Sequence, residues 1–527
     1  MPFIAVPVAL AIASVTGVAV SVSAVTTGLY LIGAVALSVA SSALQRSLKP
    51  DVPGDTGASA LASLNAPEVK ASVRQATPSQ RILYGHQRFG GAFAFYKAKP
   101  GFLYVQHMYS RRKLTRILGL NINGFKVPLS SFAFDTIVRP LAVDGQPNYP
   151  GRLRVCFQQG SLDQPINPLL DDAFDLPPEW RLPGIANAVY EFQYGSDYDE
   201  FTALWGNVQI PDVEPEAETA PVYDPRDPSQ WLPTDPSDID EWFAAQESWK
   251  YTDNAALIAA DHLWQKDGLN AGQAGVDWAK VAEAADRCDE ACATRDTATT
   301  GIYEKRYTAA GVVTLDQVVA NVFDGLLTAS RSTMIQGNRG LVWVSHDAPS
   351  RSVFTITDDM IIGAVTYRGF KGRHDLANKT QMRFVSPGRK YQLSDGPPLI
   401  RADLIAEDGQ ELPLSVSLPY TPSASAAQRI AKADLSEARL EESWNGVIDL
   451  RGLGIREDDT VLIASKICPH WNKLYKVDRY TVALNLQGES GIGLSLIAYD
   501  PDIIRDWDAT TDDQAVDLVD TDDLLAA

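Results

Sequence analysis

The first 45 residues form the longest apolar run of the chain, and the first charged side chains are Arg46 and Lys49. The run exceeds the ~20 apolar residues that a bilayer-spanning helix needs. It predicts two helices, residues 3–22 and 27–45, separated near Ser21–Gly28, although its Val and Ile content also suits strands. No basic segment precedes it, which argues against a secretory signal. Three interpretations stay open: a membrane anchor, a buried bundle of several copies, and a segment that is later released into a membrane.

After the small-residue linker 51–65, the pattern changes to short apolar runs separated by turn residues. Runs of this kind, rich in β-branched and aromatic residues, predict strands. Gly85 and Gly90-Gly91 fit the turns between them. We therefore expect the first half of the chain to be β. The predicted strands are Arg81–Tyr84, Phe102–Val105, Leu153–Phe157 and Val189–Phe192.

Residues 211–240 are rich in Pro and acidic residues and have almost no apolar periodicity. This composition predicts a surface loop or a crossing between domains. Helices are expected next, at Asn254–Trp264 and Asp277–Cys292. The clearest helix begins at Thr314, which forms a capping-box pattern with Gln317. Its apolar positions recur at helical spacing and are Leu315, Val318, Val319, Val322, Phe323, Leu326 and Leu327.

Strand-like runs return in the last third of the chain, around one polar helix. This helix is predicted over Ala424–Glu442, with Ile430, Leu435 and Ala438 facing inward. The acidic stretch Asp506–Ala527 is expected to fray. The fold class is therefore α+β, with several domains, mostly antiparallel sheets and a few helices. The strands predicted here are Leu341–Val344, Val353–Thr357, Val447–Leu450, Thr460–Ile463, Tyr480–Leu484 and Leu494–Ile497.

Composition supports a folded chain of several domains. A length of 527 residues exceeds the roughly 250–300 residues at which single cores stop growing. The net charge of −20 and the pI of about 4.7 argue against a protein that grips phosphate backbones, because such binding depends on Lys and Arg. An acidic wall would instead let DNA pass without sticking to it.

The four cysteines are too few for a disulfide framework in so long a chain. Cys288 and Cys292 fall at helical spacing on one apolar face, which predicts buried core cysteines. The motif Cys468-Pro469-His470 lacks the two further ligands that a zinc site needs. The apolar face also contains Trp278, Val281 and Ala285.

Motifs that carry chemistry are missing from the sequence. We find no nucleotide-binding loop, paired metal ligands, nucleophile elbow or zincin helix. With 66 acidic residues, no pair of carboxylates can be singled out for glycoside hydrolysis. We therefore predict no catalytic, cofactor-binding or metal-binding residues, no cofactor and no enzyme. The six histidines are predicted to be surface or satisfied core residues: His86, His107, His262, His346, His374 and His470.

Several local patterns occur in one order along the chain. Val73–Gly85, followed by Gly90-Gly91, resembles the first strand of the tail-tip hub proteins of lambda-like long-tailed bacteriophages. Val222–Asp227, Trp249–Leu257 and Val276–Trp278 are similar to that family's series VYDPR, W…DNPA and DW, the most specific part of the resemblance. The whole resemblance covers residues 70–507. Its further motifs are Cys288–Glu290, Arg306-Tyr307, Gly311–Val313, the helix after Thr314, Arg429–Ala431, Gly452–Gly454, Tyr499–Pro501 and Trp507.

The resemblance implies a homotrimeric virion protein at the phage tail tip, made in the host cytoplasm. Such a hub closes the tail tube, anchors receptor-binding or fibre proteins, and gates the release of the tape-measure protein and DNA. Its tube-like domains face the hexameric distal tail ring, and other tail-tip proteins are further partners. Larger members continue into fibre-like regions beyond the position of Trp507, so we expect a separate protein to recognise the host.

In a hub, the apolar residues 1–45 would form a central plug against the tape-measure protein or enter the host membrane during ejection. Two other functions stay open, namely a membrane-anchored bacterial surface or secretion protein and a tail-associated cell-wall hydrolase. The pattern and the resemblance together predict seven segments. They are the apolar segment 1–50, the start of the hub core 51–101, an inserted β domain 102–213, an α/β part 214–330, a β domain 331–420, a closing β domain 421–507 and an acidic tail 508–527.

Overall fold

A computed structural model describes residues 78–516, apart from short gaps. The apolar residues 1–45, on which the predicted helices fall, lie outside the described residues, as do residues 517–527. In the described part of the chain no helix is long and apolar enough to cross a membrane. All described residues belong to one unit, residues 65–527. The gaps are 144–148, 195–201, 203, 206–209, 236, 337–340, 346, 348–351, 458 and 484–489.

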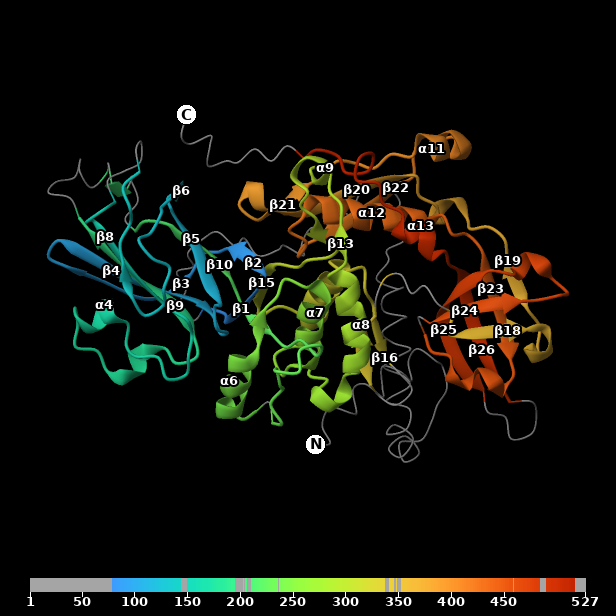
Figure 1. The fold of residues 1–527 in the computed structure, drawn as a ribbon, viewed down its shortest axis with the longest axis horizontal. Helices are drawn as coiled ribbons and strands as arrows, with labels where there is room; N and C mark the ends of the chain where they lie inside the picture. Colours follow the sequence, from blue (N-terminus) through green and yellow to red (C-terminus); the bar gives the residue numbers. More distant parts are fainter. Residues whose placement is uncertain are drawn as a thin grey trace, which may run out of the picture. The chain divides into compact units, whose positions relative to one another are not determined.

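The first part of this unit consists of two β-sheets that contribute to one apolar core (Figure 1). The strand order is β3-β4-β9-β8-β7 in one sheet and β2-β10-β5-β6 in the other. All four strands predicted in this half are confirmed, as β1, β4, β8 and β9. The elements are β1 (Arg81–Tyr84), β2 (His86–Arg88), β3 (Ala92–Lys99), β4 (Phe102–Ser110), β5 (Arg116–Ile122), β6 (Phe125–Lys126), β7 (Ile137–Val138), β8 (Leu153–Gln158), α4 (Pro168–Asp171), β9 (Ala186–Gln193) and β10 (Val213–Glu218).

Of the surface loop predicted over 211–240, the described residues of 223–238 contain no helix or strand, as expected. Residues 213–218 correct the prediction, because they form strand β10. It lies between β2 and β5 and pairs with both in antiparallel register. Each of its glutamates meets a basic side chain of a neighbouring strand. Opposite charges on adjacent strands stabilise a sheet, so the acidic residues of β10 support a strand and not a loop. The ion pairs are Glu214–Arg88, Glu216–His86 and Glu218–Arg116.

His107 of β4 departs from the prediction of a satisfied core histidine. Its side chain is buried against aromatic rings, including Phe93 and Tyr190. Neither ring nitrogen has a hydrogen-bond partner. Burial, helped by the charge of Arg81, lowers the pKa of His107 to about 3. The folded chain therefore holds this imidazole in its neutral form at neutral pH.

This burial predicts a specific pH dependence. Because the folded pKa of His107 lies below its usual 6.5, its contribution to stability is complete above pH 6.5 and is lost as the pH falls toward 3. Between pH 7 and pH 5 we expect a loss of about 2 kcal/mol, which His107→Leu should abolish. Urea unfolding at both pH values measures this difference. His470→Leu, at an exposed ring, serves as the control, and an equal loss in wild type and His107→Leu would contradict the assignment.

Helices form a second core around α7 (Ala255–Trp264), whose ten residues are all buried. This helix contacts α8 (Trp278–Cys288) and α10 (Val319–Thr328). Asn254 caps it by accepting hydrogen bonds from two backbone N–H groups, which confirms the helix predicted from Asn254. The other elements here are α6 (Ile239–Ser248), β11 (Pro221–Val222), β12 (Lys250–Tyr251), β13 (Ala291–Cys292), α9 (Thr297–Thr300), β14 (Glu304–Lys305), β15 (Gly311–Thr314), β16 (Met334–Gln336) and β17 (Val342–Val344).

Two predicted helix boundaries in this part are wrong. The helix expected to begin at Thr314 begins at Val319, because Thr314 ends β15 and pairs with Arg81 of β1. Strand pairing with a distant segment thus overrides the local capping pattern. The helix expected to reach Cys292 ends at Cys288, and Cys292 lies in β13. Both cysteines are buried and free, as predicted.

The last part contains a three-stranded sheet, β21-β20-β22, and a six-stranded sheet, β18-β24-β25-β26-β23-β19 (Figure 1). The α+β class is confirmed, and the sheets are mostly antiparallel, although β18–β24 and β20–β22 pair in parallel. The predicted strands are confirmed with shifted ends, apart from the end at Leu484, which lies outside the described residues. The elements are β18 (Phe354–Thr357), β19 (Thr366–Arg368), β20 (Lys379–Ser386), β21 (Gln392–Asp395), α11 (Ala402–Asp408), β22 (Pro413–Leu418), α12 (Ala424–Ala438), β23 (Ser443–Ile448), β24 (Thr460–Ala464), β25 (Leu474–Ala483), β26 (Gly491–Ala498) and α13 (Pro501–Arg505).

Helix α12 holds the chain that follows Trp507. The Lys432 ammonium bonds the Asp512 carboxylate at 2.8 Å, and the Ser425 hydroxyl donates to Asp513 at 2.9 Å. The fraying predicted for Asp506–Ala527 is therefore wrong for its described part, because these carboxylates find donors on a helix more than seventy residues earlier.

Candidate functional site

The histidines of the described part of the chain do not form a cluster. His86 lies 2.7 Å from the Glu216 carboxylate, whereas His262 is buried in α7 against Phe323. The His470 ring contacts Tyr367 and Trp471. His346 and the His374 side chain lie outside the described residues. Over the described ranges, no group of three or more His, Cys, Asp or Glu side chains could hold a metal ion.

The VYDPR segment folds into an ion-paired loop against α8. Arg226 bonds Asp224 of its own segment at 2.8 Å and reaches Asp286 and Asp289 of α8 and its C-terminus at 2.9 and 2.8 Å. The hydrogen bond with Asp224 and those with the two α8 carboxylates raise the pKa of Arg226 against the effect of burial. The segment thus attaches the chain between β11 and α6 to a core helix.

A buried ion pair connects the β part to α7. Asp261 of α7 pairs with Arg112, which follows β4, at 3.0 Å, and both side chains are almost fully buried. The Tyr84 hydroxyl of β1 donates to the same carboxylate at 2.6 Å. The Arg112 guanidinium also lies over the rings of Trp242 and Trp249, at 5.3 and 5.8 Å from their centroids. Three segments distant in sequence therefore meet at one carboxylate.

A second buried carboxylate, Asp347, joins the helices to the last part of the unit. It accepts hydrogen bonds from Arg287 of α8 at 2.8 Å and from the Tyr307 hydroxyl at 2.5 Å. Arg331, which follows α10, lies 3.7 Å away. Arg331 in turn bonds Asp434 of α12 at 2.7 Å. We call these five residues the Asp347 network.

Burial and charge act in opposition in the Asp347 network. Burial by itself would raise the pKa of Asp347, but the charges of Arg287 and Arg331 outweigh it and lower that pKa. At Asp434, burial is the larger effect and raises the pKa despite Arg331. Sequence inspection missed both buried carboxylates, Asp261 and Asp347. For Asp261 a signal existed, since it is an acidic residue inside the otherwise apolar helix Ala255–Trp264.

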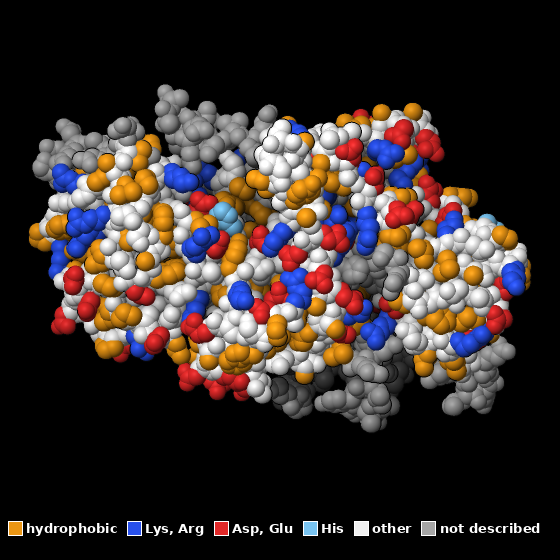
Figure 2. Space-filling view, in the orientation of Figure 1, with side chains coloured by type: hydrophobic (Ala, Val, Ile, Leu, Met, Phe, Trp, Pro, Cys, Tyr) orange, Lys and Arg blue, Asp and Glu red, His pale blue; other side chains and the backbone are white. Residues whose placement is uncertain are grey.

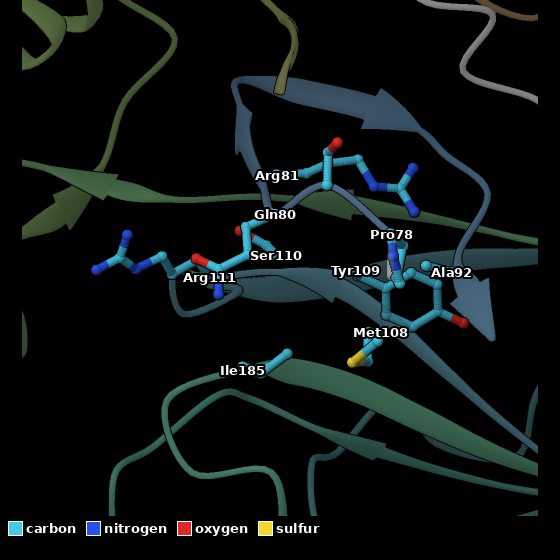
Figure 3. Close-up of a pocket in the computed structure, with 10 residues that line it drawn as sticks. Pro78, Gln80, Arg81, Ala92, Met108, Tyr109, Ser110, Arg111 and Ile185 are labelled. Carbon is cyan, nitrogen blue, oxygen red and sulfur yellow. The ribbon is translucent and has the colours of Figure 1, made fainter. Parts of the chain in front are cut away.

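One shallow depression lies where β1, β3 and β4 meet (Figure 3). Its volume of about 50 Å³ is far below the roughly 300–1,000 Å³ of ordinary small-molecule sites. None of its lining residues is acidic. They are Pro78, Ser79, Gln80, Arg81, Ala92, Met108, Tyr109, Ser110, Arg111 and Ile185.

Charge is distributed unevenly along the chain. Residues 78–213 contain 13 basic and 12 acidic residues, a net charge of +1, whereas residues 214–527 contain 29 basic and 51 acidic residues, a net charge of −22. The acidic character therefore belongs to the helical and C-terminal parts.

Apolar side chains are scattered over the face shown in Figure 2. Single exposed apolar residues of this kind are ordinary for a protein surface.

No family model and no curated protein matches the chain. Among solved structures it is similar to a chain of the virion of a native gene transfer agent particle, with 14% identity and a TM-score of 0.52, over 82% of this chain and 88% of that one. The 43 kDa tail protein of prophage MuSo2 from Shewanella oneidensis also matches, with 9% identity and a TM-score of 0.28, over 81% and 96%. So does a tail protein from Neisseria meningitidis MC58, with 9% identity and a TM-score of 0.28, over 75% and 96%. The first likeness shows a shared fold over most of the chain.

Proposed function

We propose that this chain is a structural protein of a phage-type tail, and more specifically the hub that closes the tail tube at its tip. The observation that carries the proposal is the fold shared with a virion chain along 82% of the sequence. The ordered motifs that resemble tail-tip hubs, within residues 70–507, support the same assignment. In this function the protein is a homotrimer that anchors receptor-binding or fibre proteins and gates the release of the tape-measure protein and DNA.

The positions of the motif residues support a scaffold. Asn254 caps α7 and donates to the Ala285 carbonyl of α8, Arg226 bonds α8, and Tyr307 belongs to the Asp347 network. Each holds two segments together, and none lines the depression at β1. Residues used in this way stabilise a shape that other subunits recognise, which suits an assembly protein better than a catalyst.

The uneven charge supports a conduit. With −22 charges per chain, the part made of residues 214–527 would repel DNA from the wall of a channel formed by several copies. The nearly neutral residues 78–213 would face outward, where they contact other tail proteins. We propose the seven predicted segments as the working division of this hub.

A density map of purified tails tests the proposed position. We expect three copies of the chain at the end of the tail tube, beneath the distal tail ring, with threefold density that closes the lumen. Finding the chain in repeated rings along the tube, or not finding it in purified tails, would refute the hub.

Deletion of residues 1–45 tests the role of the apolar segment. If the segment plugs the lumen, tails that lack it should assemble poorly or leak, because burying apolar surface stabilises a plug by ~25 cal/mol per Å². If it enters the host membrane, assembly should be normal and DNA delivery should be lost. Deletion of residues 517–527 is the control. Normal assembly with normal delivery would contradict both roles.

A further inference from the structure

Ile467 and Phe370 are the most exposed large apolar side chains of the described chain, with exposed fractions of 80% and 79%. Ile467 lies in the loop between β24 and β25, and Phe370 follows β19. These two segments are neighbours in space, since the Tyr367 ring of β19 contacts the His470 ring of the loop, with centroids 5.3 Å apart. Exposed apolar side chains on adjacent segments are typical of a surface that another molecule covers.

The loop that carries Ile467 is held in place by one carboxylate. Asp358, which follows β18, accepts a hydrogen bond from the Ser465 hydroxyl at 2.5 Å. It also accepts hydrogen bonds from the backbone N–H groups of Lys466 and Ile467, at 2.7 and 3.3 Å. A loop that is fixed before binding loses little conformational freedom in a contact. Ile467 is therefore positioned in advance for a partner.

The two segments are basic, although the chain around them is acidic. Residues 366–373 and 465–473, which we call the basic loops, contain five basic and no acidic residues, whereas residues 214–527 have a net charge of −22. Five positive charges minus the three carboxylates that accept hydrogen bonds from the basic loops leave a net charge of +2. The basic loops thus favour an acidic partner. The three carboxylates are Asp358, Glu441 and Glu442.

A matching surface occurs on the same chain, along α6. Residues 231–247, which we call the α6 segment, contain five acidic and no basic residues, and Figure 2 shows acidic side chains gathered over this helix. Lys113 pairs with one of the five, Glu247. The α6 segment also exposes two large apolar side chains, Ile239 at 62% and Trp231 at 40%. It therefore combines the acidic charge and the apolar surface that would complement the basic loops.

We propose that the basic loops bind the α6 segment of a second copy of this chain. Ile467 and Phe370 of one copy pack against the apolar side chains of the next, and the opposite charges around them set the orientation. Because the contact joins two different surfaces, it is head-to-tail, and such contacts close into rings. The inference rests on the proposed function, since it names the interface between copies in the proposed homotrimer.

A charge exchange tests the contact, with sedimentation velocity of the full chain as the measurement. The pair Arg368→Glu and Lys466→Glu, in the basic loops, should raise the Kd of self-association at least about tenfold, because like charges then face each other. Asp235→Lys with Asp240→Lys, in the α6 segment, should do the same. All four positions are exposed. Every copy contributes both surfaces, so the chain with all four substitutions should associate nearly like the wild type, and failure to recover would overturn the proposal.

The apolar part of the contact has its own test. Ile467→Glu should raise the Kd of self-association about tenfold or more, because it places a charge in the centre of the contact. Ile302→Glu is the matched control, since Ile302 is 69% exposed in the segment between α9 and β14, and it should associate like the wild type. An unchanged Tm in both variants shows that the fold is intact. Equal self-association of the two variants would contradict the contact.

The outcomes separate this contact from the proposed hub. Threefold density at the tail tip, together with charge variants that associate like the wild type, would refute the contact and leave the hub. A wild-type chain that stays monomeric at its highest soluble concentration would also refute the contact. Recovery by the charge exchange, together with absence of the chain from purified tails, would support the contact and remove the hub.

Discussion

Replacing Asp347 by Asn is expected to lower the free energy of unfolding by about 3–5 kcal/mol. The substitution keeps the size of the side chain but removes the charge that faces Arg287 and Arg331, and the exposed fraction of the Asp347 side chain is 0%. Two buried guanidinium groups would then share only the remaining carboxylates. Urea unfolding followed by tryptophan fluorescence measures the loss.

Asp286→Asn is the matched control for Asp347→Asn. Asp286 also pairs with an arginine, Arg226, but its side chain is 71% exposed. An exposed ion pair contributes about 0–1 kcal/mol, so this variant should stay close to the wild type. Equal losses in the two variants would mean that burial does not determine the effect.

The pH dependence gives the Asp347 prediction a second measurement. Because its folded pKa lies below the usual value for Asp, the charge of Asp347 contributes stability above about pH 3.9, and this contribution is lost as the pH falls through the folded pKa. The difference between wild type and Asp347→Asn should therefore be constant near pH 7 and shrink below about pH 4. A difference that grows with acid would contradict the assignment.

Gly85→Ala is expected to cost about 2–5 kcal/mol, as the sum of a backbone and a packing effect. Gly85 joins β1 to β2 at φ +70°, where a side chain is strained. A Cβ atom there would also lie 2.2 Å from the Ala309 carbonyl oxygen and 2.8 Å from Ala310 Cα. Because both are backbone atoms, β15 and the residues before it would have to move.

Gly409→Ala separates the two effects. Gly409 has the same φ of +70°, but nothing lies within 4 Å of the position of its Cβ. It should therefore show only the backbone cost of about 1–2 kcal/mol. Urea unfolding of both variants measures the difference. Equal losses in the free energy of unfolding would show that the backbone around β15 moves away from a Cβ at Gly85 without cost.

The spacing of apolar residues was sufficient to predict an element wherever that spacing matches the side chains that the element buries. The apolar alternation of residues 153–157 and the apolar, Asn-capped run 254–264 predicted β8 and α7, since burial imprints these periods on the sequence itself. The α+β class follows from the same signals. The unusual apolar segment 1–45 and the absence of catalytic motifs are also evident from the sequence.

Pairing between distant segments could not be seen in the same way. Strand β10 looked like an acidic loop because its stabilising partners, such as Arg88, lie 126 residues from Glu214. The capping pattern at Thr314 predicted the start of a helix, but Thr314 pairs with Arg81 of β1 and ends strand β15.

The sequence by itself therefore determined the class, most elements and the resemblance that points to a tail hub, because these depend on neighbours along the chain. Only the tertiary structure decided which charges are buried and paired, as at Asp261 and Asp347. The cost of burying a charge depends on solvent exclusion and on partners brought together by folding, and neither is encoded at any single position.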